Sequence, residues 1–586
     1  MVDEVLDGTA PLPGGWPTRF ADRYPLQHAQ TITWLDRALA EAAARRDAER
    51  EPANQGLAEQ RHLLSRCTGA DQLSTVVEEA ATLGSVGGAR GYRIRTHDGL
   101  VFTGTFQMPT HGQPRAAVIL AGRPAATGAV AAERYHAAGL VTIQPCLAAP
   151  IHSFSDHASR RWLHFTDDEL LHLFFFIVGG SLAGLEAVEL RTVARSLARR
   201  ADGSALPVVF DLGGTKALPA AVAAALESDL CGLLVLHPET AAFDRQEHDA
   251  RVNTIWGFHR SFDGLTLLTL AEAVPLLFVE DTTTPSPLFA RSKLWLGGAP
   301  RLIERILAVA GEERATLAAD IGLARWTAAP QPSITERGDE RTEADLYREA
   351  LESKLSYLEC RHGTARTERQ RRYALSELTP ERYRQRVGES LERVMGPALP
   401  LAPERRCRSR LVVDRPTHAV YQVVLQSVPG IDVAGYLLVP HGTQERPTVI
   451  CQHGLSGRPE YLAGLEDEWI YDRVAQRLAE KGYVTFTPFM TWGWGGTPGR
   501  DALVKRAYAL GITPNRFEVA QLQAIVDFLQ ARPEVQSDRI AFYGLSYGGH
   551  ASLWLSAHEP RLAAVITAGH FNDWQDKLTN TEITAP

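Results

Sequence analysis

The sequence has few cysteines, and they form no recognised pattern. The six cysteines in 586 residues are scattered, and no two are spaced as C-x-x-C. This argues against a disulfide framework and against a zinc site of that type. H-E-x-x-H is also missing and the histidines are isolated, which removes the usual metal-ligand motifs. We therefore expect neither a metal nor another cofactor.

The chain also lacks an excess of positive charge. Its net charge is −8, and the Arg-rich stretch Arg366 to Arg372 is typical of a solvated helix face. No G-x-G-x-x-G follows a predicted strand, and the glycine-rich stretch Gly84 to Gly88 has no Walker lysine. These absences predict no nucleic-acid partner and no nucleotide site.

Long hydrophobic runs are absent as well. The most apolar segment, Leu170 to Val178, is about nine residues long, whereas a bilayer-spanning helix needs roughly 20. The acidic N-terminus has neither the basic start nor the apolar core of a secretory signal. We expect a cytoplasmic protein with no membrane partner, in which Leu170 to Val178 forms a buried helix. Whether the chain forms a homo-oligomer stays open.

What the chain does contain is an alternation of strand and helix patterns, in an ordinary globular composition. At 586 residues it is too long for one core, so we expect more than one domain. Continuous apolar runs such as Ala116 to Ala121 and Thr448 to Gln452 are typical of strands buried on both faces of a parallel sheet. Helices between such strands predict an α/β fold with two doubly wound sheets.

We divide the chain into four parts. Residues 1–90 form an N-terminal helical region, with expected helices over Ala29 to Arg50 and Leu73 to Leu83. Residues 91–325 form a first α/β domain, which opens on a hairpin turned at Asp98-Gly99. Residues 326–405 form a charged helical linker, and residues 406–586 form a second α/β domain.

The stretch Arg539 to Leu553 carries the clearest chemical signal. It predicts a strand that runs into Gly544-Leu545-Ser546-Tyr547-Gly548-Gly549 and then into a helix. G-x-S-x-G in this context places the serine on a sharp turn, where the glycines avoid clashes and the helix N-terminus favours a developing oxyanion. Ser546 is therefore the candidate nucleophile. The same pentapeptide also occurs by chance in glycine-rich loops.

The second domain resembles the dienelactone-hydrolase and acetyl-xylan-esterase branch of the α/β-hydrolases. The resemblance rests on His453-Gly454 after a buried strand, the run Pro533-Glu534-Val535 and the serine turn, in that order, over roughly residues 406 to 575. It implies an α/β-hydrolase fold and hydrolysis of a small-molecule ester through acyl-Ser546. It also implies an oxyanion hole made of the backbone N–H groups of Tyr547 and Leu455.

The same resemblance predicts an incomplete triad. In this fold the acid and the histidine follow the seventh and eighth strands, and only 40 residues follow Ser546. We therefore expect the second sheet to lack its last strands. Asp573 is a candidate acid, whereas His550 lies one helical turn from Ser546 and is poorly placed as the base. The chain is then a fragment, receives its last strands from elsewhere, or is not a working enzyme.

The first domain resembles the same fold in a degenerate form. Its expected turn reads Asp211-Leu212-Gly213-Gly214-Thr215, so the nucleophile position falls on Thr215, or on a glycine if the register shifts. Asp281 stands at a plausible acid position without a serine to serve. We expect this domain to be inactive, with a threonine nucleophile as the alternative.

Two other functions fit parts of the sequence. A serine peptidase of the prolyl-oligopeptidase type shares Gly-x-Ser-Tyr-Gly-Gly, but the strand repeats of that family's β-propeller are missing. A non-catalytic binding or assembly protein would fit the Thr215 domain and the incomplete triad.

Overall fold

The computed structural model describes most of the chain, in two compact units. The described ranges are 24–49, 56–109, 111–122, 125–148, 167–198, 205–237, 255–271, 274, 276–278, 335–338, 341–374, 376–403, 406–455, 457–467, 470–489 and 500–571. One unit, the N-terminal lobe, comprises the described residues of Ala43–Gln370. The other, the C-terminal lobe, comprises those of Arg371–Asn580 and those up to Ala42.

The N-terminal lobe is built on a nine-stranded sheet, in the order β8-β7-β6-β4-β5-β3-β2-β1-β9 among the described strands. Strands β4 to β8 pair with one another in parallel, whereas β1 with β2, β2 with β3, and β3 with β5 form antiparallel pairs. The strands are β1 (Val77–Val86), β2 (Ala89–Thr96), β3 (Val101–Gln107), β4 (Ala117–Ala121), β5 (Val141–Pro145), β6 (Val208–Leu212), β7 (Leu233–Leu236), β8 (Leu276–Phe278) and β9 (Thr335–Glu336).

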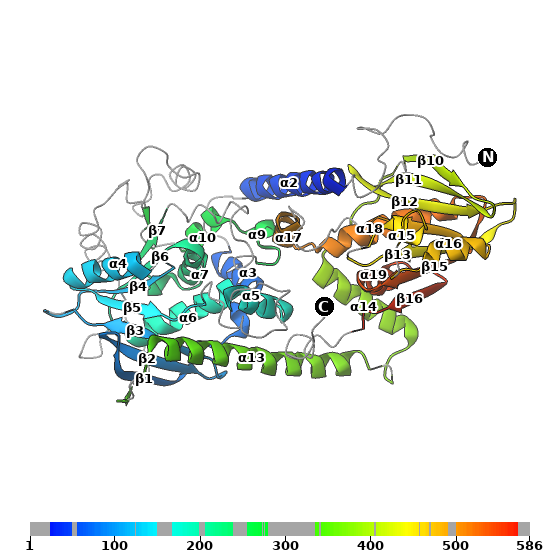
Figure 1. Ribbon diagram of the computed structural model, residues 1–586. Coiled ribbons are helices and arrows are strands. Elements are labelled where there is room, and N and C mark those ends of the chain that lie inside the picture. Colours follow the sequence, from blue (N-terminus) through cyan, green and yellow to red (C-terminus); the bar gives the residue numbers. More distant parts are fainter. Residues whose placement is uncertain are drawn as a thin grey trace. The chain divides into compact units, whose positions relative to one another are not determined.

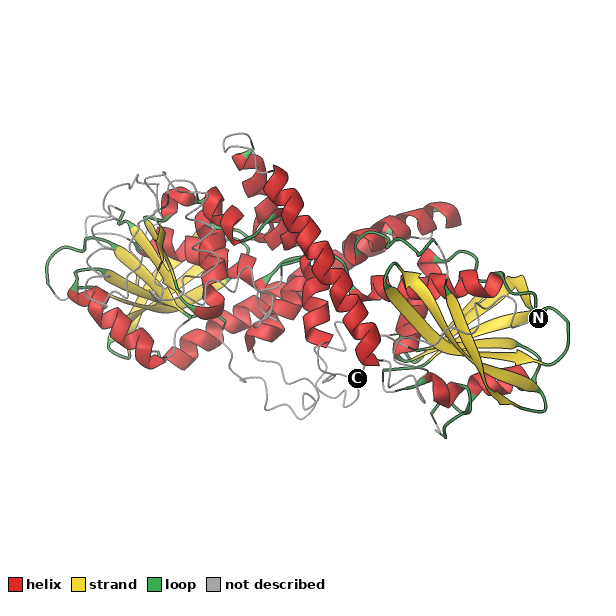
Figure 2. Ribbon diagram, turned by 90° about the horizontal axis from the view of Figure 1, so that it is seen from above, coloured by secondary structure: helices red, strands yellow, loops and turns green. Residues whose placement is uncertain are grey.

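Helices surround this sheet (Figures 1 and 2). They are α3 (Leu57–Thr68), α4 (Ala125–Ala137), α5 (Asp167–Ile177), α6 (Leu182–Leu197), α7 (Ala217–Leu226), α9 (Phe258–Ser261), α10 (Gly264–Leu270) and α13 (Glu343–Arg372). Helix α6 is buried over almost its whole length, and its two buried glutamates, Glu186 and Glu189, are each paired with a lysine. It begins at Ser181, whose side chain accepts a hydrogen bond from the Gly184 N–H at 3.0 Å.

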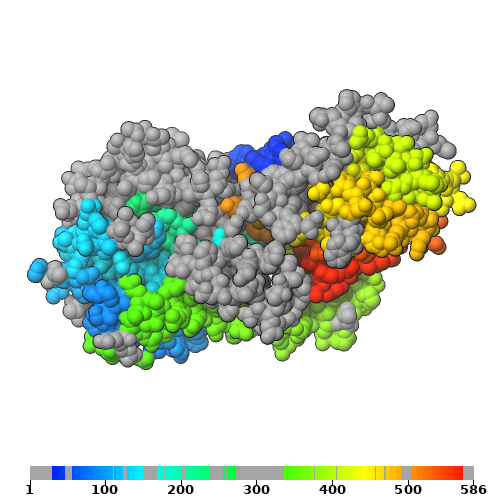
Figure 3. All heavy atoms as spheres, in the orientation of Figure 1, coloured from blue at the N-terminus to red at the C-terminus, as the bar shows by residue number. Residues whose placement is uncertain are grey.

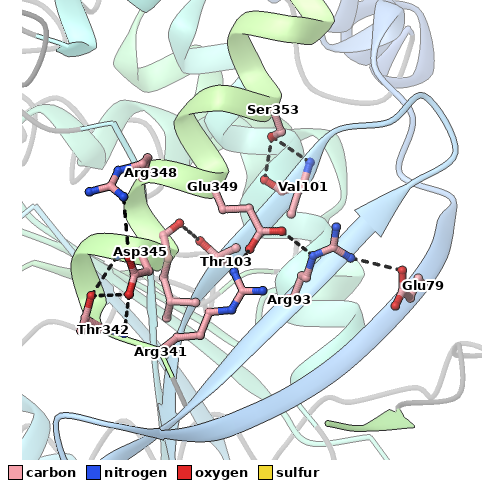
Figure 4. A network of polar contacts seen from close by, with 11 residues as sticks. Glu79, Arg93, Val101, Thr103, Arg341, Thr342, Asp345, Arg348, Glu349 and Ser353 are labelled. Atoms are coloured by element: carbon pink, nitrogen blue, oxygen red, sulfur yellow. Dashed lines mark hydrogen bonds and ion pairs between the residues drawn. The ribbon is translucent and has the colours of Figure 1, made fainter. Parts of the chain in front are cut away.

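Helix α13 is fastened to the β1–β2–β3 edge by polar contacts (Figure 4). Glu349 bonds Arg93 at 2.6 Å, and the Ser353 hydroxyl bonds both the N–H and the C=O of Val101. The Thr103 hydroxyl donates to the Leu346 carbonyl at 2.6 Å. These contacts satisfy backbone groups of strand β3 that would otherwise lack partners.

The C-terminal lobe is built on a seven-stranded sheet, in the order β10-β11-β12-β14-β13-β15-β16 among its described strands. The strands are β10 (Cys407–Asp414), β11 (His418–Val428), β12 (Ile431–Pro440), β13 (Arg446–Gln452), β14 (Val484–Pro488), β15 (Val535–Leu545) and β16 (Ala564–Ala568). The turn between β11 and β12 contains Gly430 at φ 84°, as the Pro-Gly sequence predicts. Strand β16 lies at the sheet edge, and the red segment that contains it reaches the surface of the lobe (Figure 3).

The helices of this lobe include one from the start of the chain. They are α2 (Tyr24–Glu49, which belongs here up to Ala42), α14 (Pro380–Met395), α15 (Pro459–Leu462), α16 (Val474–Glu480), α17 (Arg500–Ala509), α18 (Pro514–Gln530) and α19 (Tyr547–His558). Trp34 of α2 packs edge-on against Phe517 of α18, with ring centroids 5.4 Å apart. Gln30 bonds Asp432, and Asp36 bonds Arg506, so the expected Ala29 to Arg50 helix forms and packs on this lobe.

The two lobes repeat one topology. Read from β16, the second sheet runs β16-β15-β13-β14-β12-β11-β10, and the first runs β7-β6-β4-β5-β3-β2-β1 in the corresponding positions. The antiparallel joints β3–β5 and β12–β14 also correspond. The α/β prediction with two doubly wound sheets is therefore confirmed. The first sheet has β8 beyond β7, whereas no described strand lies beyond β16.

One expected helix is wrong. The segment Leu73 to Leu83 is not helical, because β1 occupies Val77–Val86 and pairs with β2. Its alanines and glutamates favour a helix, but pairing along β2 and burial of Ala80, Ala81 and Leu83 override that local preference. The apolar segment near residue 170 does form a helix, α5. No helix in the described ranges is long and apolar enough to cross a membrane.

Candidate active site

Ser546 stands on a sharp turn between β15 and α19. Its backbone has φ 57° and ψ −115°, and in the described ranges a positive φ occurs at only three non-glycine residues. Its N–H donates to the Ala568 carbonyl at 2.8 Å, which ties the turn to the end of β16. The side chain is exposed. The predicted order of strand, turn and helix is therefore present.

The glycines around Ser546 are required by close backbone contacts. A Cβ on Gly544 would lie 1.9 Å from the Gly548 carbonyl oxygen, and one on Gly548 would lie 2.5 Å from the Gln452 carbonyl oxygen. A Cβ on Gly549 would lie 2.7 Å from the Ala568 carbonyl oxygen. Since real Cβ atoms essentially never approach so closely, a larger residue at any of these positions would push the turn apart.

The loop after β13 lies directly beside this turn. A Cβ on Gly454 would be 3.2 Å from the Ser546 Cβ and 3.4 Å from the Leu545 carbonyl oxygen. Leu455 follows Gly454, and Tyr547 is the first residue of α19, where a backbone N–H has no acceptor within its own helix. The structure thus brings Ser546, Tyr547 and the Leu455 loop together, as the resemblance implies.

The histidines near the turn are engaged elsewhere. His453 is buried and bonds the Gly454 carbonyl through Nδ1 at 2.7 Å, and burial lowers its pKa to about 4. His550 stacks on His570 with ring centroids 4.7 Å apart. Burial, and secondarily His570, lowers the pKa of His550 to about 4. The His550 backbone N–H donates to the Ser546 carbonyl at 3.0 Å, which is a contact of the helix backbone and does not involve the imidazole ring.

Tyr547 forms one wall beside the turn. Its ring packs against a cluster of apolar side chains from α2, α17 and α18 that includes Leu35, Leu503 and Phe517. Its hydroxyl accepts a long hydrogen bond from Asn515 Nδ2 at 3.5 Å. Since α17 and α18 supply this wall, the surroundings of Ser546 depend on helices far from it in sequence.

The corresponding turn of the N-terminal lobe holds no hydroxyl at the nucleophile position. Leu212 pairs with Ala121 at the end of β6, as Gly544 pairs with Gln452 at the end of β15. Two residues beyond Leu212 stands Gly214 at φ 54°, in the place that Ser546 occupies. Of the two predicted possibilities, Thr215 and a glycine in a shifted register, the strand pairing favours the glycine, Gly214.

A buried ion pair occupies this degenerate turn. Lys216, two residues after Gly214, bonds Glu186 of α6 at 2.6 Å, and both side chains are buried. Burial raises the pKa of Glu186, and Lys216 opposes that shift. The corresponding positions of the C-terminal lobe hold Gly548 and Glu518. Gly548 follows Ser546 at the same distance as Lys216 follows Gly214. Glu518 follows the helix cap Thr513 at the same distance as Glu186 follows the cap Ser181. The sequence analysis missed this pair, which the alignment of the two lobes could have indicated.

Two predicted carboxylates cannot be placed. Asp281 and Asp573 both lie outside the described residues. Within the described ranges, no group of three or more His, Cys, Asp or Glu side chains could hold a metal ion.

The region around the serine turn is similar to known proteins. Residues 433–586 match the model of the Dienelactone hydrolase family. A 2,6-dihydropseudooxynicotine hydrolase of Paenarthrobacter nicotinovorans is 29% identical over 146 residues, which are 25% of this chain and 34% of that protein. The chain thus aligns with about a third of this relative's length.

Solved structures of esterases also match part of the chain. An acetyl xylan esterase from Paenibacillus sp. R4 is 20% identical and matches 30% of this chain and 63% of its own, with a TM-score of 0.23. A glucuronoyl esterase from Solibacter usitatus is 16% identical and matches 33% of this chain and 59% of its own, with a TM-score of 0.24. With the strand order and the serine turn, the family match over residues 433–586 shows that the C-terminal lobe contains an α/β-hydrolase domain of the dienelactone-hydrolase type.

Proposed function

We propose that the C-terminal lobe is a serine hydrolase that cleaves carboxylic esters through an acyl-Ser546 intermediate. The observation that carries the proposal is the turn itself: an exposed serine at φ 57°, between a buried strand and a helix N-terminus. Strained backbone at an exposed hydroxyl costs stability and adds no packing, which favours a catalytic role. The family match supports a hydrolase.

Under this proposal each step of the reaction falls to particular groups. The Ser546 Oγ attacks the ester carbonyl carbon while a general base takes its proton, and the carbonyl oxygen becomes an oxyanion. The N–H groups of Tyr547 and Leu455 would donate to that oxyanion. Collapse of the tetrahedral intermediate breaks the bond to the alcohol, which leaves with the proton held by the base. Water then attacks the acyl-serine in the same way and releases the carboxylic acid.

The proposal needs a general base at the Ser546 Oγ. His453 is unsuitable because its ring is buried and its Nδ1 is bonded to the Gly454 carbonyl. His550 is unsuitable because it lies one helical turn along α19 and stacks on His570. The remaining sources of the base and its acid partner are His570, residues outside the described ranges, where Asp573 lies, and another chain.

The test is labelling of the complete gene product with a fluorophosphonate probe, which reacts with activated serines. We expect labelling of the wild type, none of Ser546→Ala, and full labelling of Thr215→Ala, because the turn of the N-terminal lobe presents Gly214. Hydrolysis of p-nitrophenyl acetate should follow the same pattern. No labelling of the wild type would overturn the proposal and favour a binding or assembly protein. Cleavage of peptides in preference to esters would favour the peptidase alternative.

A further inference from the structure

The hydroxyl of Tyr471 is built into the loop beside Ser546. Tyr471 is 7% exposed, and its hydroxyl accepts a hydrogen bond from the Gly454 N–H at 3.0 Å. A Cβ on Gly457 would lie 2.3 Å from this hydroxyl oxygen, and one on Gly454 would lie 3.2 Å from it. The loop therefore closes around the hydroxyl, and both glycines leave room for it.

The same loop fixes the direction of one peptide group. The Gly454 carbonyl oxygen is bonded by the Gly457 N–H at 3.0 Å and by His453 Nδ1 at 2.7 Å. A carbonyl oxygen only accepts, so His453 Nδ1 carries the proton. In a planar trans peptide the C=O and the next N–H point in opposite directions. Holding the Gly454 carbonyl inward therefore turns the Leu455 N–H outward, and that N–H bonds no described residue.

Tyr471 is in turn held by strained backbone. Asp472 and Arg473, the next two residues, have φ 48° and 51°, and with Ser546 they are the three non-glycine residues at positive φ in the described ranges. The Tyr471 ring also stacks on Tyr461 with centroids 6.3 Å apart. Strain of this kind persists only where the surrounding contacts enforce it, and here it begins at Asp472, directly after the residue whose hydroxyl enters the loop.

We propose that Tyr471 is a positioning residue of the oxyanion hole, which fixes the Gly454 peptides so that the Leu455 N–H points at the reacting carbonyl oxygen. The inference rests on the proposed function, since the oxyanion forms only if Ser546 attacks an ester. Tyr471 itself touches no reacting atom. It acts through the Gly454 N–H, which would be left without an acceptor inside the protein if the hydroxyl were removed.

The variant that tests this is Tyr471→Phe, with Tyr483→Phe as the matched control. Both lose one phenolic hydroxyl in the same lobe, and Tyr483 follows α16, away from the loop. For Tyr471→Phe we expect kcat toward p-nitrophenyl acetate to fall about 10- to 100-fold, with KM within about twofold, because the oxyanion exists only in the transition state. Affinity for a trifluoromethyl ketone, which forms a bound oxyanion, should fall by a similar factor. Tyr483→Phe should change neither.

A second readout does not depend on activity. Hydrogen exchange measured on peptides spanning residues 449–457 should accelerate in Tyr471→Phe and stay unchanged in Tyr483→Phe, while exchange over α18 reports that the lobe is folded. Unchanged kcat and unchanged exchange in a folded Tyr471→Phe would overturn the inference, as would a rise in KM alone. Failure of the proposed function has a different signature: Ser546→Ala would keep full wild-type activity.

Discussion

Ser546 stores backbone strain that a glycine would not have. At φ 57° and ψ −115° its Cβ crowds the neighbouring peptides, and such conformations cost on the order of 1–3 kcal/mol. The N-terminal lobe has Gly214 at φ 54° in the corresponding place. Comparing Ser546 with Gly214 shows that a positive φ at this turn does not require a side chain. Of the two turns, the one in the C-terminal lobe has a hydroxyl at this position.

We therefore predict that Ser546→Gly is more stable than Ser546→Ala, although both lose activity. Glycine removes the strain but costs about 0.5–1 kcal/mol of unfolded-state entropy, whereas alanine keeps the Cβ. The expected net difference is about 1 kcal/mol in the unfolding free energy of the C-terminal lobe, measured by urea denaturation. Equal stabilities would show that the surrounding glycines have already relieved the strain.

At the residue scale the sequence predicts what is local and misses what is not. The serine turn can be predicted from the sequence because its strand, its glycines and its helix follow one another within about fifteen residues. Tyr471 is not, because its hydroxyl reaches Gly454, 17 positions away, through a turn with two left-handed residues that no motif announces. Between Thr215 and a glycine the sequence does not decide, because only strand pairing fixes where β6 ends.

At the scale of elements, helix α13 is held to the N-terminal lobe by a buried charge pair. Lys354 of α13 bonds Glu189 of α6 at 2.8 Å, and the two side chains are 2% and 0% exposed. Burial raises the pKa of Glu189, and Lys354 is the main opposing influence. Near its start the same helix carries a weaker, exposed ion pair between Arg348 and Asp345, at 3.8 Å (Figure 4).

Removing one partner of the buried pair should destabilise the lobe far more than removing both. For Lys354→Met, which leaves Glu189 buried without its cation, we expect a loss of about 3–5 kcal/mol, and Lys354→Met with Glu189→Leu should recover most of it. The control Arg348→Ala breaks an exposed pair and should cost under about 1 kcal/mol. Hydrogen exchange along α13 and urea denaturation measure both. A double variant as unstable as the single one would mean that packing of the lysine stem dominates.

The sequence predicts many of the helices, but it does not predict where they pack. In α18 (Pro514–Gln530) the buried apolar residues Val519, Leu522, Val526 and Leu529 recur at helical spacing, which the sequence alone displays. By contrast, nothing in Ala29 to Arg50 indicates that its N-terminal part packs on α17 and α18, which lie more than 450 residues along the chain. Burial of Leu35 against those helices depends on tertiary contacts that local patterns do not encode.

At the scale of the whole molecule, the chain carries two hydrolase-type sheets with different chemical content. Alternating strands and helices predicted both sheets, because central strands such as β4 are continuous apolar runs. The N-terminal lobe has kept the strand order and the glycine turn, with the Lys216–Glu186 pair in place of the site elements. Its role under our proposal is structural, whereas hydrolysis belongs to the C-terminal lobe.

Because each lobe has its own buried core, we predict two separable unfolding transitions by differential scanning calorimetry. The variants above assign them: Ser546→Gly should shift only the transition of the C-terminal lobe, and Lys354→Met only that of the N-terminal lobe. Since the two sites share no partners, the shifts should add when the substitutions are combined. A single transition that both variants move would mean that the lobes unfold together, because the free energy that couples them exceeds the difference between their stabilities. In that case Lys354→Met should also weaken fluorophosphonate labelling of Ser546 near the transition temperature, whereas independent lobes leave the labelling unchanged.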